Sequence, residues 1–289
     1  MREKSRTNSK ALPIYILLAA LIALVASNLY RSQQANRLVA LIRAGKSDDA
    51  LQLIAKGGRL NTTAYEPKIE RSLSLLACAA YYKQEAVADE LLRRGAKPDS
   101  DALNYAVKNS MTDLTLTLLN RGAKADQKPL FGEVPLLLMA VRNDNLRVAQ
   151  ALLAKGAESN AFNFGATPSP VVVAAQSPRP DMLRLLLNSS ASPDFISFVG
   201  DPPLTAAVRS NRIENLRLLL KYHAHADVPD ARGWSPLMYA VDSKNMEAIR
   251  ILLQNHADPR FKAMGTQTAL DLAKASPQIL ALFSRGAKK

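Results

Sequence analysis

The three histidines of the chain, His223, His225 and His256, are the residues whose type most suggests metal chemistry. His223 and His256 are 33 residues apart, and imidazole is a common zinc ligand. Structural zinc sites mostly include cysteine, but the chain has a single cysteine, Cys78. His223 and His256 also stand where related stretches have glycine, and histidine tolerates left-handed backbone. The sequence therefore predicts turn residues here, with no metal and no cofactor.

Three acidic residues recur every 33 residues, and each is followed three positions later by arginine, a spacing that invites comparison with a catalytic dyad. Each acid falls in the first turn of a predicted helix, where the helix dipole favours negative charge, and each arginine is its i,i+3 neighbour. No nucleophile, base and orienting group converge on the chain. We therefore predict solvated ion pairs and no enzymatic activity, with an enzyme or enzyme accessory as the disfavoured third hypothesis. The pairs are Asp181 with Arg184, Glu214 with Arg217, and Glu247 with Arg250.

The spacing of alanine and leucine shows that these residues belong to a repeated unit. Each of the first six marker alanines is followed twelve and thirteen residues later by two leucines. Such a period is typical of stacked helical units, none of which can bury its apolar face alone. The alanines are Ala79, Ala106, Ala140, Ala174, Ala207, Ala240 and Ala273. The leucine pairs are Leu91-Leu92, Leu118-Leu119, Leu152-Leu153, Leu186-Leu187, Leu219-Leu220 and Leu252-Leu253.

The stretch from Ser235 to Pro259 shows how one unit is built. Ser235 is suited to cap a helix, and Pro236 fits its first helical position. Ala240 is small enough to let this first helix approach its neighbours. The second helix carries an apolar stripe that ends in Leu252-Leu253. Each unit is therefore predicted to be a pair of helices, closed by a turn that often contains glycine.

This pattern resembles the ankyrin repeat family, whose units open with T-P-L-H-x-A and close with G-A-D-x-N. The resemblance covers roughly residues 31 to 289 and implies an all-α solenoid of stacked helix pairs, with hairpin loops projecting to one side of a concave, protein-binding surface. The histidine of the opening motif is absent throughout, and the pattern is least regular between residues 100 and 136. The matching stretches are SPLMYA (Ser235 to Ala240), PPLTAA (Pro202 to Ala207), TALDLA (Thr268 to Ala273), RGAKAD (Arg121 to Asp126) and KGAESN (Lys155 to Asn160).

The N-terminal region has a different composition. Residues 1–10 form a basic tail, and residues 11–30 carry no charge and are long enough to cross the roughly 30 Å core of a bilayer. We predict a transmembrane anchor over 11–30; the alternative is a signal peptide cleaved after Val25-Ala26-Ser27. Because neither glycine nor proline occurs between Pro13 and Gly45, one continuous helix is expected.

The predicted anchor carries further expectations about location. The slight bias of basic residues places the N-terminus inside, which gives a single-pass protein of the bacterial inner membrane with its repeats in the periplasm. The alternative is an exported, soluble protein after cleavage. Ala19, Ala23 and Ser27 are spaced by four residues, so two spans could associate weakly through them.

The remainder divides into an N-terminal cap over 31–61, six full repeats over about 72–260, and a shortened C-terminal cap over 265–289. Caps are expected to differ from full units because one of their faces meets no neighbour. Cys78 falls on the apolar side of a first helix and is predicted to be a core residue.

Candidate partner-binding residues follow from two patterns. The two residues after the alanine pair of each first helix should face the same concave side, and aromatic residues gather in the connections between units. The first pattern selects Tyr81, Tyr82, Lys108, Arg142, Asn143, Gln176, Arg209, Ser210 and Asp242. The second selects Phe131, Phe164, Phe198 and Trp234.

The concave groove selected by the first pattern would be aromatic at one end and basic along its middle, which favours an acidic protein partner. Nucleic acid is not predicted, because the Lys and Arg residues are spread over all units instead of forming one stripe interleaved with aromatics. The leading hypothesis is a membrane-tethered scaffold or adaptor. The alternative is a stoichiometric inhibitor, such as an immunity protein that blocks a toxic enzyme in the same compartment.

Overall fold

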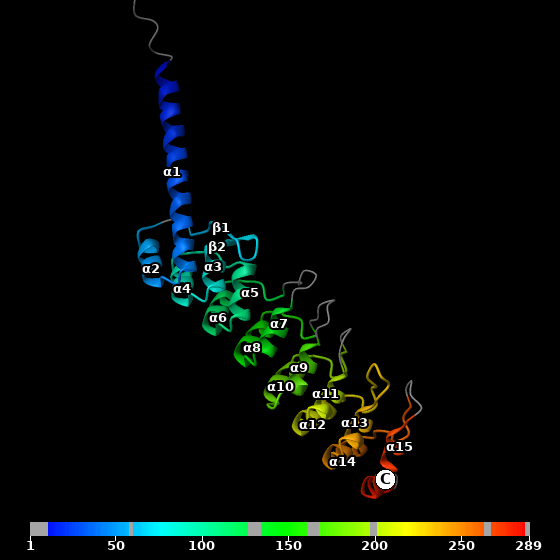
Figure 1. The fold of residues 1–289 in the computed structure, drawn as a ribbon. Helices are drawn as coiled ribbons and strands as arrows, with labels where there is room; N and C mark the ends of the chain where they lie inside the picture. Colours follow the sequence, from blue (N-terminus) through cyan, green and yellow to red (C-terminus); the bar gives the residue numbers. More distant parts are fainter. Residues whose placement is uncertain are drawn as a thin grey trace, which may run out of the picture. The chain divides into compact units, whose positions relative to one another are not determined.

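The computed structural model describes residues 11–57, 60–126, 134–160, 168–196, 201–262 and 267–286. The chain divides into two compact units, Met1–Ala123 and Lys124–Lys289. Both units consist of helix pairs, and each unit is described by itself (Figure 1).

Unit 1 contains three helix pairs and one small sheet. Helices α1 and α2 form the first pair, and the strands β1 and β2 separate it from the pairs α3–α4 and α5–α6. The elements are α1 (Ala11–Arg43), α2 (Ser47–Ala55), β1 (Thr63–Glu66), β2 (Arg71–Ser74), α3 (Leu75–Tyr81), α4 (Glu85–Arg93), α5 (Ser100–Lys108) and α6 (Thr112–Asn120).

Unit 2 contains five helix pairs. We call the odd-numbered helices from α3 to α15 first helices and the even-numbered helices from α4 to α16 second helices. The elements are α7 (Leu136–Arg142), α8 (Leu146–Ala154), α9 (Pro170–Gln176), α10 (Asp181–Asn188), α11 (Pro203–Arg209), α12 (Ile213–Lys221), α13 (Pro236–Asp242), α14 (Met246–Gln254), α15 (Ala269–Ala273) and α16 (Pro277–Gly286).

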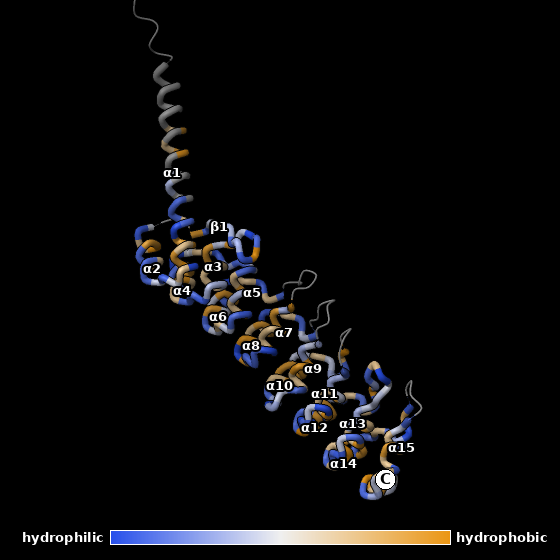
Figure 2. Tube along the Cα trace, viewed as in Figure 1, coloured by the Kyte–Doolittle hydropathy of each residue, from blue (hydrophilic) through white to orange (hydrophobic). Residues whose placement is uncertain are grey.

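Within each unit the first helices pack side by side in one layer and the second helices in another. All seven marker alanines are buried, which lets neighbouring first helices approach closely. Hydrophobic and hydrophilic segments alternate along the helices, as expected where one side is buried (Figure 2). Cys78 is fully buried in this core, as predicted, and burial raises the pKa of its thiol to about 12.

Local interactions fix where the helices begin and end. Ser74 and Ser235 cap α3 and α13 by accepting a hydrogen bond from the backbone N–H three residues later. Each second helix from α4 to α14 is followed, directly after its C-cap, by a residue with positive φ, which is glycine at Gly122 and Gly156. His223 and His256 take the same conformation, with φ of 64° and 65°, so their predicted role as turn residues is confirmed.

Polar side chains join successive repeats within a unit. The Asn215 side chain on α12 is almost fully buried, and its amide nitrogen donates to the carbonyls of Ala174, Ala175 and Ser177 at 3.3, 3.0 and 2.8 Å. Arg217 pairs with Glu247 of the next repeat at 3.1 Å. The Glu214–Arg217 pair predicted within one helix is therefore replaced by a bridge between repeats.

The predicted transmembrane anchor over 11–30 is wrong. In the part of the chain that the structure describes, no helix has both the length and the apolar character needed to cross a membrane. Helix α1 is continuous over 33 residues, as expected, but its second half carries polar and charged residues from Arg31 to Arg43. That half packs on α2 and α3 as part of the repeat core, with Leu38, Val39 and Ile42 buried.

The correction extends to the expectations that depended on the anchor. Single-pass localisation in a bacterial inner membrane is not supported, and the contact between two spans through Ala19, Ala23 and Ser27 presupposed such an anchor. Cleavage near Ser27 followed by export stays a prediction.

The connection from Asn61 to Ser72 forms an unexpected hairpin. Strands β1 and β2 pair antiparallel, with Thr63 opposite Ser74 and Glu66 opposite Arg71. The hairpin contacts α1, α3 and α5. The sequence indicated only a longer connection here.

Replacing Asn215 tests the importance of the polar link between repeats. We expect Asn215→Ala to lower the free energy of unfolding by about 2 kcal/mol, because buried carbonyls lose their donor. Urea unfolding followed by fluorescence of Trp234, the chain's single tryptophan, reports on this unit. Gln150→Ala, at an exposed position of α8, should stay within about 0.5 kcal/mol of the unchanged protein. Equal effects of the two changes would contradict the assignment.

Candidate functional site

Six of the predicted partner-binding residues occupy equivalent places in the fold. Each is the last residue of a first helix. Because the first helices of a unit pack side by side, these residues form a row in each unit. We call these six residues the helix-end row. Tyr81 is half-buried, and the other five side chains are exposed. Unit 1 contributes Tyr81 and Lys108, and unit 2 contributes Arg142, Gln176, Arg209 and Asp242.

The other predicted residues lie beside this row or outside the described ranges. Tyr82, Asn143 and Ser210 directly follow the first helices as C-caps. Trp234 is half-buried just before α13. The predictions on three phenylalanines fall outside the described residues, and these are Phe131, Phe164 and Phe198.

Arg209 contacts one side chain of its own repeat and one of the next repeat. Its guanidinium sits 5.2 Å from the centroid of the Tyr239 ring on the neighbouring helix α13 and forms an ion pair with Asp201. The Trp234 ring lies 5.0 Å from the Tyr239 ring at an interplanar angle of 49°. We call Asp201, Arg209, Asp230, Trp234 and Tyr239 the Arg209 cluster.

Asp230 holds the aromatic part of this cluster in place. Its side chain is largely buried, and one carboxylate oxygen accepts the backbone N–H groups of Arg232 and Trp234 at 2.9 and 2.8 Å. The other oxygen accepts the Tyr239 hydroxyl at 2.5 Å. Burial and this hydrogen bond raise the pKa of Tyr239 to about 12, so the phenol is neutral at physiological pH. Tyr239 therefore presents a fixed aromatic face to Arg209.

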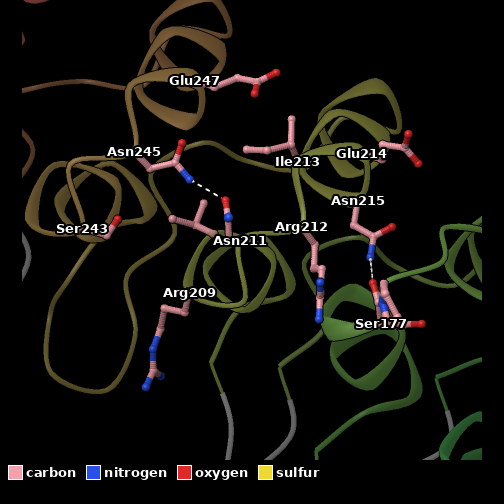
Figure 3. Close-up of a pocket in the computed structure, with 12 residues that line it drawn as sticks. Ser177, Arg209, Asn211, Arg212, Ile213, Glu214, Asn215, Ser243, Asn245 and Glu247 are labelled. Carbon is pink, nitrogen blue, oxygen red and sulfur yellow. Dashed lines mark hydrogen bonds between the residues drawn. The ribbon is translucent and has the colours of Figure 1, made fainter.

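A polar hollow of about 680 Å³ lies where the turns after α9, α11 and α13 meet. Figure 3 shows Asn245 and Asn211 pointing toward one another and Arg209 pointing away from both. Asn245 donates to Asn211 at 2.8 Å, and the Arg212 Nε donates to the Gln176 carbonyl at 3.0 Å. Asn211, Asn245 and Arg212 therefore join successive repeats around the hollow, and Arg209 also lines it.

A second aromatic arrangement occupies unit 1. The Tyr81 ring meets the rings of Tyr82 and Tyr105 edge-on, at centroid distances of 4.9 and 5.0 Å. The Lys68 Nζ, carried by the turn between β1 and β2, lies 5.5 Å from the centroid of the Tyr82 ring. The sequence predicted an aromatic end of the row at Tyr81 and Tyr82. The hairpin adds the Lys68 ammonium group beside these tyrosines.

Glu66 fixes this hairpin from within. Its carboxylate is fully buried, pairs with Arg43 of α1 at 3.2 Å and accepts the backbone N–H of Lys68 at 3.2 Å. Burial alone would raise the pKa of Glu66, but the nearby Tyr82 hydroxyl, the Lys68 amide and the Arg43 guanidinium outweigh it and lower the pKa. Glu66 is therefore ionised and links α1 to the hairpin.

The sequence did not identify Tyr239, Tyr105, Asp230 or Lys68. A signal was available for the two tyrosines, because each precedes a member of the helix-end row by three residues and so shares its helical face. Asp230 and Lys68 had no comparable signal, since their positions depend on how the connections fold.

A family model of ankyrin repeats matches the chain three times, over residues 75–163, 103–197 and 171–263. The crystal structure of the human ASB11 ankyrin repeat domain is similar, with a TM-score of 0.60 and 25% sequence identity, over 77% of this chain and 98% of that one. No curated protein sequence matches the chain significantly.

Tyr239→Phe tests the support of the Arg209 cluster. Because Asp230 loses a donor, we expect the free energy of unfolding to fall by about 1 kcal/mol. The raised pKa means that this contribution is complete below the ordinary tyrosine pKa of about 10 and is lost as the pH rises through about 12. Urea unfolding at pH 7 and at pH 9 should therefore give the same difference. Tyr222→Phe is the matched control, since its hydroxyl bonds to exposed Asn188, and a similar cost there would contradict the role of Asp230.

Glu66→Gln tests the link within unit 1. Since the pKa of Glu66 is lowered in the folded protein, its contribution is present above the ordinary pKa, about 4.3, and is lost as the pH falls through the folded value. The variant should be less stable than the unchanged protein at pH 7, and the difference should shrink in acid. Unfolding followed by circular dichroism measures this, with Glu85→Gln at the exposed start of α4 as control. A difference that grows in acid would contradict the ionised, paired state.

Proposed function

The chain belongs to the ankyrin repeat family, and from that membership and its helix-end row we propose that it binds a partner protein through this row and the neighbouring loops. Ankyrin repeat domains are in general protein–protein interaction modules. The observation that carries the proposal is the chemical character of the row. Five of its six side chains are exposed, and the row presents tyrosine and arginine, which are enriched at the energetic centres of interfaces.

The charge of the row favours an acidic partner. Lys108, Arg142 and Arg209 are exposed, and Asp242 is the one acidic member of the row among the described first helices from α3 to α13. The net charge of +13 acts in the same direction, because it attracts acidic surfaces over distances of about a Debye length. The proposed role is that of a scaffold or adaptor for such a protein.

An inhibitor of a toxic enzyme would use the same surface. The two roles differ in what happens to the partner, which keeps its activity on a scaffold and loses it on an inhibitor. Assaying the captured partner with and without the chain separates them.

Reversing two charges of the row tests the proposed surface. The partner is captured from source cells with the intact chain and purified, and its affinity is measured by calorimetry. We expect Arg142→Glu combined with Arg209→Glu to weaken binding at least about tenfold, because acidic groups then meet like charge.

The matched control is Arg184→Glu combined with Arg250→Glu. These residues are exposed on the second helices α10 and α14, so the net charge changes equally on another face. The control should bind within about threefold of the unchanged chain, since distant exposed charges are screened by salt. Equal weakening by both double variants would show that overall charge, and not the row, determines binding.

A further inference from the structure

We infer that the Arg209 cluster is a receptor for a carboxylate side chain of the partner and that Asp201 occupies it in the free protein. This inference rests on the proposed function and narrows it to one contact. The cluster has the parts that such a receptor needs: an exposed guanidinium, a fixed aromatic face against it and a carboxylate already bound.

The Arg209 guanidinium is oriented so that it can form two parallel hydrogen bonds with a carboxylate. Arg209 is the last residue of α11, and its charged group lies over Tyr239 on α13. Tyr239 is itself fixed by Asp230, and Trp234 packs against the same ring. A guanidinium stacked on an aromatic ring keeps its in-plane N–H groups available, and their fork matches the two oxygens of a carboxylate.

Arg209 binds the Asp201 carboxylate only weakly. The Arg209 side chain is 45% exposed and that of Asp201 is 23% exposed, so the pair is partly hydrated. Hydrated ion pairs contribute little to stability, because water and salt screen the attraction. A partner carboxylate that binds Arg209 and also packs on Trp234 can therefore replace Asp201 at little cost. Asp201 acts as an internal competitor that lowers the affinity for poorly matched acidic ligands.

The surroundings favour a protein carboxylate over a nucleic acid. Asp201 lies just before α11, the helix that carries Arg209, and Asp242 ends α13 of the next repeat, so negative charge is present on both of these repeats. A phosphodiester chain would place several negative charges near these acids, whereas one glutamate or aspartate side chain needs only the space over Arg209. Trp234 adds the kind of aromatic contact on which an extended peptide can pack.

Trp234 provides a direct readout because it is the only tryptophan in the chain. The full chain is titrated with an acetylated, amidated hexaglutamate peptide while Trp234 fluorescence is followed. We expect a saturable change with hexaglutamate and none with the corresponding hexaglutamine peptide. Arg209→Gln should abolish the response, and Arg209→Lys, which keeps the charge but lacks the fork, should weaken binding about three- to tenfold.

Removing the internal competitor is the decisive step. Asp201→Asn should tighten hexaglutamate binding by about three- to tenfold, because Arg209 no longer has to exchange partners. Asp181→Asn, at the exposed start of α10, makes the same charge change away from the cluster and should alter the affinity less than about twofold. Equal tightening by both variants would overturn the role of Asp201.

Two further results would overturn the inference. One is hexaglutamate binding that persists unchanged in Arg209→Gln. The other is stronger, Arg209-dependent binding of a hexathymidylate oligonucleotide than of hexaglutamate, which would identify phosphate as the ligand. If either occurs while the Arg142→Glu, Arg209→Glu double variant still weakens binding of the natural partner, the carboxylate receptor is wrong and the proposed function stands.

Discussion

The close packing of successive first helices is the constraint on which the rest of the structure depends. The marker alanines are buried at every repeat from Ala79 to Ala273, and a larger side chain there would push neighbouring helices apart. No helix pair can bury its leucines without the next pair, so stability is spread over the contacts between repeats. The core therefore tolerates little variation, and residues that differ between repeats stand at the helix ends and in the connections.

Hydrogen bonds from polar side chains also join successive repeats. Asn109 in unit 1 donates to the Ala80 carbonyl of the preceding repeat at 2.8 Å, and Asn215 does the same for three carbonyls in unit 2. In the connections, Asp194 and Asp227 accept the backbone N–H groups of His225 and Asp258, one repeat further on. These directional bonds fix the register of neighbouring repeats, which hydrophobic contacts alone leave less sharply defined. The positions of the helix-end residues relative to one another follow from that register.

The repeat architecture was predictable because its marker residues recur at a regular spacing in the sequence. The alanine spacing, the leucine pairs and the capping serines each predicted the helix pairs, and the family match confirms the helical ankyrin solenoid. The predicted membrane anchor failed because uncharged composition over residues 11–30 was considered apart from the helix that contains it. Helix α1 continues into the repeat core, where Val39 and Ile42 are buried. The β1–β2 hairpin was missed because its short strands depend on contacts with α1 and α3 rather than on a local pattern.

The candidate site was predictable in part for the same reason. A fixed period identifies equivalent positions, so the helix-end row could be read from the sequence, but it does not show which side chains meet across repeats. Arg209 and Tyr239 come from successive first helices, which are typically about 8–10 Å apart, and only the folded structure brings them into contact.

This spacing also limits what can bind the row. A partner that lies along unit 2 meets Arg142, Gln176, Arg209 and Asp242 in succession, each about one helix spacing from the last. Single exposed contacts of this kind contribute little, so useful affinity requires that several match at once. A partner would match all four residues if it placed acidic groups at Arg142 and Arg209, an uncharged group at Gln176 and a basic group near Asp242. The order of these residues, more than the net charge of the chain, therefore determines which acidic proteins fit.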